Sequence, residues 1–264
     1  AFSCWQRDAQ GPLFSLEGWP KPIHDFHKDR PHGEVDLVEA LAVSCNVYFA
    51  QLGLELGPQP FTDLIDAGVE IGYASRRIRF DPGADGSRQL ASTAFGQGAM
   101  AMNVLQAARL VAAIGAGGTY RKCPATLELA ARCEERRIVD DPAALAPLLA
   151  GMRAVMTRGT GARLEAVPGV RIYGKTGTAD TPRFRGEELP ATAGDPPPHS
   201  WFVALVEPEA TASACAPAAP GRIALAVVVP RGGSGAATAG PIAIEIAKTL
   251  VRLGYLPGGE GDAR

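Results

Sequence analysis

The spacing of apolar residues changes near residue 160, and this change limits the possible folds more than any other feature of the sequence. Before Arg158, apolar side chains recur at the spacing of an amphipathic helix. From Val170 on, they form short β-branched or aromatic runs bounded by turn residues, as strands do. Helices followed by a strand meander predict an α+β or layered α/β domain.

The part before residue 160 contains segments with helical spacing and recognisable ends. They run from Asp36 to Gly57, from Asn103 to Gly115, and from Asp141 or Pro147 to Arg158. Asp36 and Asn103 are residue types that cap helix starts, and Glu39 completes a capping box with Asp36. The first segment is one helix or two joined ones. Glycines and prolines interrupt residues 1–33 and 57–98, so we expect these to be irregular, apart from a short helix near residues 60–67.

The part after residue 160 is predicted to form an antiparallel sheet and a final helix. The expected strands are Val170–Thr178, Trp201–Glu207 and Ile223–Val229. The segments between them are too short and polar to hold a crossover helix, so adjacent strands should be antiparallel. A helix from Pro241 to Arg252 follows, with proline at its first position. We therefore divide the domain into a mainly helical part, residues 1–160, and a sheet part, residues 161–264.

Composition and charge argue against several kinds of partner. The 264 residues are 46% apolar, enough for a core, and the net charge is −2 without a basic block. Nothing in this pattern indicates a nucleic-acid or membrane-surface partner. No apolar run reaches the roughly 18 residues that a membrane helix needs. Because the chain begins at Ala1 rather than with methionine, we interpret it as a fragment or a processed chain.

Neither the cysteines nor the histidines show the spacing of a metal site. The cysteines form no CxxC pair, so we expect ordinary thiols, with a Cys123–Cys133 bridge as the alternative. The other cysteines are Cys4, Cys45 and Cys215. A group of histidines and aspartates could suggest a metal, but we interpret it as a solvated loop: His24, Asp25, His27, Asp29 and His32. No metal and no cofactor is therefore expected.

Two short polar motifs are candidates for chemistry. Ser44-Cys45-Asn46 lies inside an apolar helical segment, where polar side chains are costly if buried without partners. Both side chains could instead bond carbonyls of the preceding turn, or Asn46 could cap a second helix. Lys175-Thr176-Gly177-Thr178-Ala179 ends the first strand. It offers a cation, two hydroxyls and exposed backbone N–H groups, which suit a carboxylate ligand and an oxyanion, or else it is a half-exposed strand with solvated side chains.

These motifs and their neighbours together resemble the transpeptidase domain of class B penicillin-binding proteins. The matching segments keep the family's order over nearly the whole chain: His32-Gly33 leading into Ser44-Cys45-Asn46 (the family's SxN), Gly96-Gln97-Gly98, Gly159-Thr160-Gly161, Gly174–Ala179 (KTGT), His199–Val203, Ala224–Val229 with Gly232-Gly233, and Pro241. Each alone is weak, and the ordered set is strong. The resemblance implies a β-lactamase/transpeptidase-like fold, with helices flanking an antiparallel sheet and a helical subdomain beside it.

The resemblance also implies a reaction, serine acyl transfer. In the family, a serine of an SxxK motif attacks the penultimate D-alanine carbonyl of a peptidoglycan stem peptide, and an amine of a neighbouring stem takes the acyl group. Carried over by position, Ser44 would relay a proton and Asn46 would bond the substrate amide. Lys175 would supply positive charge to that proton network. Thr176 and Thr178 would bind the substrate or β-lactam carboxylate in the segment that Gly177 keeps open, and the Thr178 N–H would bind the oxyanion.

The sequence departs from the family at the nucleophile. No serine is followed three residues later by lysine. Thr119 is followed by Lys122 in this way, but a glycine-rich turn precedes it and Cys123-Pro124 follows it, rather than a helix. We therefore expect the SxxK segment upstream of this chain, and expect the chain as given to be inactive and truncated at its N-terminus.

The family's partners and location follow as expectations. They are stem peptides and β-lactams as ligands, an upstream membrane anchor, a membrane glycan polymerase as partner, and the periplasmic face of the inner membrane. Two alternatives stay open: a non-catalytic scaffold of the same fold, and a D,D-carboxypeptidase or serine β-lactamase. The Ser44-Cys45-Asn46 context and the Gly96-Gln97-Gly98 segment argue against the second. The sequence does not distinguish a role in division from one in elongation.

Overall fold

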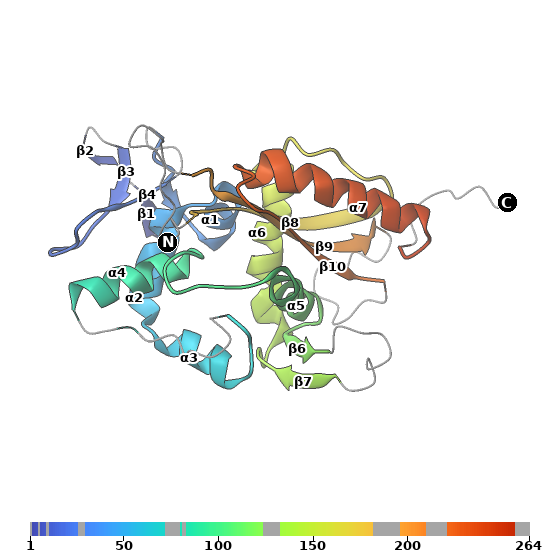
Figure 1. The fold of residues 1–264 in the computed structure, drawn as a ribbon, viewed down its shortest axis with the longest axis horizontal. Coiled ribbons are helices and arrows are strands. Elements are labelled where there is room, and N and C mark those ends of the chain that lie inside the picture. The colour runs from blue at the N-terminus through green and yellow to red at the C-terminus, as the bar shows by residue number, and fades with distance from the viewer. Residues whose placement is uncertain are drawn as a thin grey trace.

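A three-stranded antiparallel sheet is the centre of the fold (Figure 1). In this computed structural model the described residues are 2–4, 6–8, 11–25, 30–71, 80, 83–123, 133–181, 196–209 and 221–256. The strands β8 (Val170–Ala179), β9 (His199–Pro208) and β10 (Ile223–Val229) lie in the order β10-β9-β8. All neighbours are antiparallel, so the predicted strands and their pairing are confirmed.

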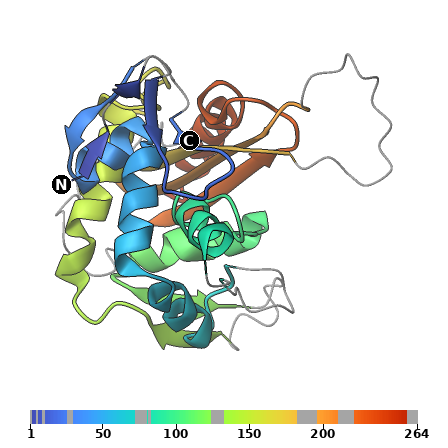
Figure 2. The ribbon, with the colours of Figure 1, turned by 90° about the vertical axis from the view of Figure 1, so that its left-hand side faces the viewer.

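Helices cover both faces of this sheet, as Figure 2 also shows. Side chains alternate between the faces of a strand. Phe202, Ala204 and Val206 of β9 therefore pack in one cluster with α7 (Gly240–Arg252). Leu205 points the other way and packs with α5 (Val104–Gly115) and α6 (Ala146–Thr157). The predicted arrangement of an antiparallel sheet flanked by helices is confirmed.

A second group of helices lies beside the sheet, toward the left of Figure 1. The predicted segment before Gly57 is two helices, α1 (Leu37–Val43) and α2 (Asn46–Leu56). The short helix expected near residues 60–67 is α3 (Gln59–Asp66). The helix α4 (Ala84–Ala94) was not predicted. It packs closely on α2, because a Cβ at Gly53 would overlap the Ala94 side chain.

The expectation that residues 1–33 are irregular is wrong for the part that the structure describes. Short strands form there: β1 (Phe2–Cys4), β2 (Gln6–Asp8), β3 (Gly11–Phe14), β4 (Ile23–His24) and β5 (Gly33–Val35). The pair β1–β5 brings Cys4 opposite Gly33. Such pairing joins residues far apart in the sequence, so hydrophobic spacing within the segment gives no sign of it.

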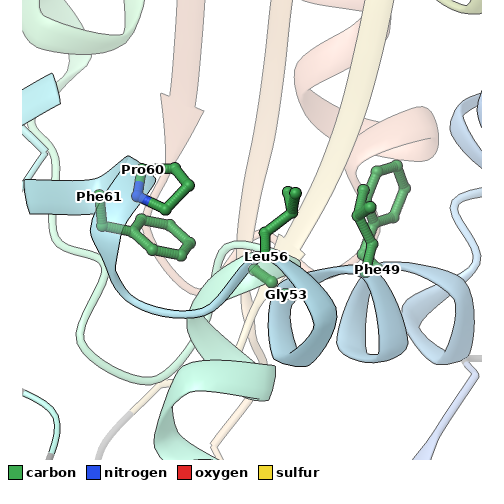
Figure 3. Close-up of a pocket in the computed structure, with 7 residues that line it drawn as sticks. Phe49, Gly53, Leu56, Pro60 and Phe61 are labelled. Carbon is green, nitrogen blue, oxygen red and sulfur yellow. The ribbon is translucent and has the colours of Figure 1, made fainter. Parts of the chain in front are cut away.

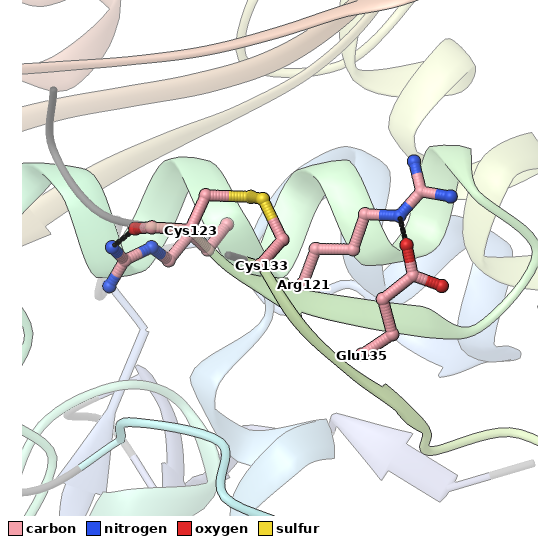
Figure 4. The surroundings of a disulfide bond; sticks show 5 residues. Arg121, Cys123, Cys133 and Glu135 are labelled. Atoms are coloured by element: carbon pink, nitrogen blue, oxygen red, sulfur yellow. Dashed lines mark hydrogen bonds and ion pairs between the residues drawn. A yellow bond between two sulfur atoms is a disulfide. The ribbon is translucent and has the colours of Figure 1, made fainter. Parts of the chain in front are cut away.

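A disulfide bond closes a two-stranded hairpin. The strands β6 (Thr119–Lys122) and β7 (Glu134–Arg137) are antiparallel, and Cys123 is bonded to Cys133 (Figure 4). The expectation of ordinary thiols is therefore wrong for these two cysteines. Cys4 and Cys45 are buried free thiols, and Cys215 lies outside the described residues.

One buried ion pair ties the sheet to α5. The Glu207 carboxylate is fully buried, accepts a hydrogen bond from the Tyr173 hydroxyl at 2.7 Å, and pairs with Arg222 at 2.7 Å. Arg222 also donates to the Gly115 carbonyl at the end of α5, at 3.0 Å. Among the helices of the described residues, none is both long and apolar enough to cross a membrane.

Candidate active site

The α1–α2 junction holds Ser44 in an unusual backbone conformation. Ser44 ends α1 in the left-handed region, at φ 57° and ψ 50°, which few non-glycine residues adopt. Its N–H donates to the Leu41 carbonyl at 3.3 Å. Cys45 then starts α2 as its N-cap, with its sulfur accepting from the Tyr48 N–H at 3.3 Å. The turn between the helices thus places a strained polar residue where α1 ends and α2 begins, a feature that often marks functional sites.

Lys175 of β8 reaches across to this junction. Its ammonium donates to the Ser44 hydroxyl at 2.7 Å and to the Thr176 carbonyl at 2.8 Å. The predicted proximity of Ser44 and Lys175, residues 131 positions apart, is confirmed. This hydrogen bond therefore connects the α1–α2 junction to the sheet and brings two reactive groups into contact.

The burial of this ammonium alters its acidity. Loss of water lowers the pKa of Lys175 to about 8, because desolvation disfavours the charged form. A lysine with a pKa near neutrality is present in both protonation states and can accept and return a proton. The contact is thus able to carry general acid–base chemistry.

A turn between α6 and β8 links the two sides of this contact. The Thr160 N–H donates to the Ala42 carbonyl of α1 at 3.0 Å. The hydroxyls of Thr160 and Thr176 lie 2.6 Å apart. A Cβ at Gly159 would overlap the Ala42 carbonyl, so the turn lies directly against α1. The turn therefore bonds α1, which ends in Ser44, to the strand that carries Lys175.

Thr178 is held from two other segments. The Gln97 side-chain amide donates to the Thr178 carbonyl at 3.4 Å, and the Gly235 N–H donates to the Thr178 hydroxyl oxygen at 3.4 Å. Gly235 approaches the strand so closely that a Cβ would lie 2.5 Å from the Gly177 carbonyl. Small residues are therefore required at this contact between β8 and the turn that leads into α7.

Asn46 does not join the Ser44–Lys175 contact directly. Its side-chain amide donates to the His24 carbonyl at 2.9 Å and so ties the start of α2 to β4. The alternative that Asn46 caps a second helix is wrong, because Cys45 is the cap. Of the three residues to which the resemblance assigns catalytic roles, the structure brings Ser44 and Lys175 into contact.

The interpretation of the histidine and aspartate segment as a solvated loop is wrong for Asp25 and His32. The Asp25 side chain is 1% exposed and that of His32 is 20% exposed, and they form an ion pair at 3.1 Å. The Cys4 thiol donates to Asp25 at 2.9 Å and the Cys45 thiol at 3.4 Å. His27 and Asp29 lie outside the described residues. This group contains residue types that bind metals, next to the junction that holds Ser44.

An apolar pocket lies along α2, from Phe49 to Leu56 (Figure 3). It lies between α2, the start of α3 and the end of α4. Its lining is entirely apolar: Phe49, Leu52, Gly53, Leu56, Pro60, Phe61 and Ala94. It offers no group for acid–base chemistry, so it is separate from the Ser44–Lys175 contact.

Sequence reasoning gave no role to Gln97, Thr160 or Gly235. Gln97 and Thr160 lie in segments that supported the resemblance, and Gly235 directly follows another such segment, Gly232-Gly233, and Ser234. The signal was a glycine beside a polar residue in each segment, which is typical of close backbone approach. Their partners Thr178 and Thr176 lie far away in the sequence, so the contacts themselves required the structure.

Comparisons with known proteins point to one family. The family described as "Penicillin binding protein transpeptidase domain" matches residues 8–251. The chain is 30% identical over 235 residues to "Peptidoglycan D,D-transpeptidase PbpA" of Mycobacterium tuberculosis, a match covering 82% of this chain and 43% of that protein. It is 28% identical over 210 residues to "Penicillin-binding protein 3" of Bacillus subtilis, covering 75% of this chain and 29% of that protein.

A solved structure agrees with these relatives. The ceftriaxone acyl-enzyme complex of penicillin-binding protein A from M. tuberculosis aligns with a TM-score of 0.65 at 27% identity. The alignment covers 90% of this chain and 54% of that one. The chain therefore spans about half the length, or less, of the relatives that it matches.

Proposed function

Because the chain belongs to the family of penicillin-binding protein transpeptidase domains, in class B, we propose that the protein carrying it is a peptidoglycan D,D-transpeptidase. The observation that carries this proposal is the 2.7 Å hydrogen bond from Lys175 to Ser44, which joins the SxN and KTGT motifs. Desolvating an ammonium beside a serine with a strained backbone is costly. Such a cost is typical of a functional site and is not expected of a lysine with a purely structural role.

Lys175 and Ser44 act as a proton relay. The nucleophilic serine attacks the D-alanine carbonyl, and its proton passes to the Ser44–Lys175 pair. The same pair returns a proton to the nitrogen of the leaving D-alanine as the peptide bond breaks and the serine ester remains. An amine of a second stem peptide then attacks the ester and gives up a proton, which the pair passes to the departing serine oxygen as the new peptide bond forms. A pKa of about 8 for Lys175 allows both proton transfers near neutral pH.

Thr176, Gly177 and Thr178 form the substrate-binding strand. The Thr178 hydroxyl oxygen accepts from the Gly235 N–H, which leaves its own proton available to a substrate carboxylate. The Thr178 N–H is one of the two oxyanion donors, and the N–H of the nucleophile is the other. Asn46 bonds the substrate's side-chain amide after exchanging its present partner, the His24 carbonyl.

The nucleophile comes from a part of the protein outside these residues. The Thr119–Lys122 segment matches the required spacing, but it is the strand β6, and Lys122 is paired with Glu70 at 3.3 Å. A nucleophile of this family needs its lysine beside the attacking oxygen at the start of a helix. We therefore infer an upstream SxxK serine in the full-length protein.

The protein works on the extracytoplasmic side of the membrane. The Cys123–Cys133 disulfide supports this location, because disulfides persist in oxidising compartments. Its relatives include an enzyme named for peptidoglycan. We further propose β-lactams as inhibitors, an upstream membrane helix as the anchor, and a membrane glycan polymerase as the partner.

The test is labelling of the full-length protein with a fluorescent penicillin. We expect the wild-type protein to be acylated, and Lys175→Met and Ser44→Ala to lower the acylation rate by about 10²–10⁴-fold, the typical contribution of a general acid or base. Lys248→Met is the matched control, since Lys248 pairs with Glu165 and Glu245 on the surface. Acylation of Lys175→Met at the control's rate would refute the relay. A folded full-length protein that does not label would favour the non-catalytic scaffold.

A further inference from the structure

Four side chains with metal-binding atoms meet in the helical part of the fold. Cys4 ends β1, Asp25 directly follows β4, His32 precedes β5, and Cys45 caps α2. One ligand atom from each lies within 4.8 Å of every other. No other group of three or more such residues comes together in the part of the chain that the structure describes.

Four distances within this cluster are close to those of a four-coordinate metal site. The Asp25 Oδ2 atom lies 2.9 Å from the Cys4 sulfur, 3.4 Å from the Cys45 sulfur and 3.1 Å from His32 Nδ1. The Cys4 sulfur lies 3.7 Å from the same nitrogen. Tetrahedral zinc with bonds of about 2.0–2.3 Å separates its ligand atoms by roughly 3.3–3.8 Å. These four separations lie within a few tenths of an ångström of that range, and the remaining pairs of ligand atoms lie within 4.8 Å of each other.

Burial keeps most of the cluster out of water. Both thiols are fully buried, and Asp25 is nearly so. A carboxylate, two thiols and an imidazole thus gather in one place, and one divalent cation can replace the protons that they share.

Neighbouring backbone groups hold two of the ligands in place. The Val47 N–H donates to the second Asp25 oxygen at 3.2 Å, which leaves Oδ2 turned toward the cluster. The Tyr48 N–H donates to the Cys45 sulfur. Both donors are in the first turn of α2. The N–H groups of a first turn have no partner within the helix, so they stabilise negative charge. Such second contacts fix ligand orientation in metal sites.

We propose that Cys4, Asp25, His32 and Cys45 bind one structural zinc ion. Thiolate and imidazole ligands favour zinc over magnesium or calcium, which prefer six or more oxygen ligands. Four protein ligands fill a tetrahedral shell and leave no position for a reacting water, which is typical of a structural site. The ion ties β1, β4, the segment before β5 and the α1–α2 junction together. Because Cys45 lies between Ser44 and Asn46, zinc binding fixes the junction that presents Ser44 to Lys175.

The test measures metal in the full-length protein purified without a metal-affinity step. Elemental mass spectrometry is expected to find about one zinc per chain. Cys4→Ser and His32→Gln should each lower the zinc content at least about fivefold, while Cys215→Ser keeps it as the matched cysteine control. Thermal unfolding, followed by circular dichroism, shows whether each variant is folded.

A second measurement serves if the variants do not fold. Chelator treatment of the wild-type protein should remove the ion and lower the melting temperature, zinc should restore it, and magnesium should not. Cobalt in place of zinc should give the intense absorption of tetrahedral cobalt–thiolate coordination. Folded wild-type protein without zinc that binds none on addition would overturn the proposal. So would iron in its place, a Cys4–Cys45 disulfide found by peptide mapping, or full zinc content in a folded Cys4→Ser/Cys45→Ser double variant.

Discussion

The sheet and the α1–α2 junction contribute one reactive group each, yet they are built in opposite ways. The strand β8 pairs with β9 over its whole length, from Val170 to Ala179, and helices cover both faces of the sheet. The junction instead combines short strands, a left-handed serine and a buried polar cluster drawn from separate segments. Lys175 is therefore positioned by regular structure, whereas Ser44 is positioned by long-range contacts. The contact between them depends on both, so changes in each region should reach it differently.

The largest effect is expected from breaking the buried ion pair of the sheet region. Glu207→Leu leaves the Arg222 guanidinium buried beside an apolar side chain and should cost about 3–5 kcal/mol of unfolding free energy. Urea unfolding of the full-length protein measures this. The double variant Glu207→Leu/Arg222→Met should recover most of the loss. A single variant that costs less than about 1 kcal/mol would show that the regular region does not depend on this pair.

The pH dependence of stability isolates Lys175. Its pKa is about 8 in the folded protein and 10.5 without perturbation, so the unfolded chain binds more protons between these values. The destabilisation from its burial is complete below pH 8 and is relieved as pH rises toward 10.5. Relative to Lys175→Met, the wild-type protein should therefore gain up to about 3 kcal/mol across this window. Lys248→Met, a surface control, should show no such gain. Parallel pH curves for wild type and Lys175→Met would contradict a buried ammonium.

Gly159→Ala tests the turn that joins the two regions. The added methyl would overlap the Ala42 carbonyl, so the turn must move away from α1, at a cost of about 1–3 kcal/mol. Gly161→Ala in the same turn meets the flexible Met156 sulfur at 3.1 Å and should cost less. Thermal unfolding and the penicillin acylation rate report on stability and on the Ser44–Lys175 contact. Equal behaviour of the two variants would mean that the approach to α1 is not required.

The smallest effect is expected from Thr160→Val. It removes the hydroxyl that lies 2.6 Å from that of Thr176 and should cost about 0.5–1.5 kcal/mol. Thr62→Val is the control, because the Thr62 hydroxyl makes only a 3.5 Å contact with the Pro58 carbonyl on an exposed helix. If Thr160 also positions Thr176 for substrate, the activation free energy of acylation should rise by more than the free energy of unfolding falls. A loss equal to that of Thr62→Val would assign Thr160 no part in joining the regions.

The sequence predicted the sheet region well because its elements follow from local patterns. The three strands, the helix from Pro241 and the antiparallel order agree with the structure. The junction region was predicted less well. The helix α4 is rich in small and polar residues and depends on the close packing of Ala94 on Gly53. The strands β1 and β5 form only through each other, so neither has a pattern of its own.

The residues of the candidate site also differ in how far the sequence predicted them. The sequence marked Ser44 as a costly polar residue in an apolar segment and Lys175 as a cation suited to a carboxylate ligand. Only the resemblance joined the two, since nothing local links a helix end to a distant strand. The cluster of Cys4, Asp25, His32 and Cys45 escaped prediction because its members are spread over four segments. Their proximity results from β-pairing and helix capping, which single-sequence reasoning does not reach.

The left-handed backbone of Ser44 has an evolutionary consequence. Glycine adopts φ 57° without the penalty of about 1–2 kcal/mol that a side chain brings. Selection for stability alone would therefore favour glycine at this helix end. A single Ser44→Gly substitution would provide that gain. A lineage that keeps serine here retains a less stable chain in exchange for a hydroxyl facing Lys175. Descendants freed from the reaction should lose this serine early.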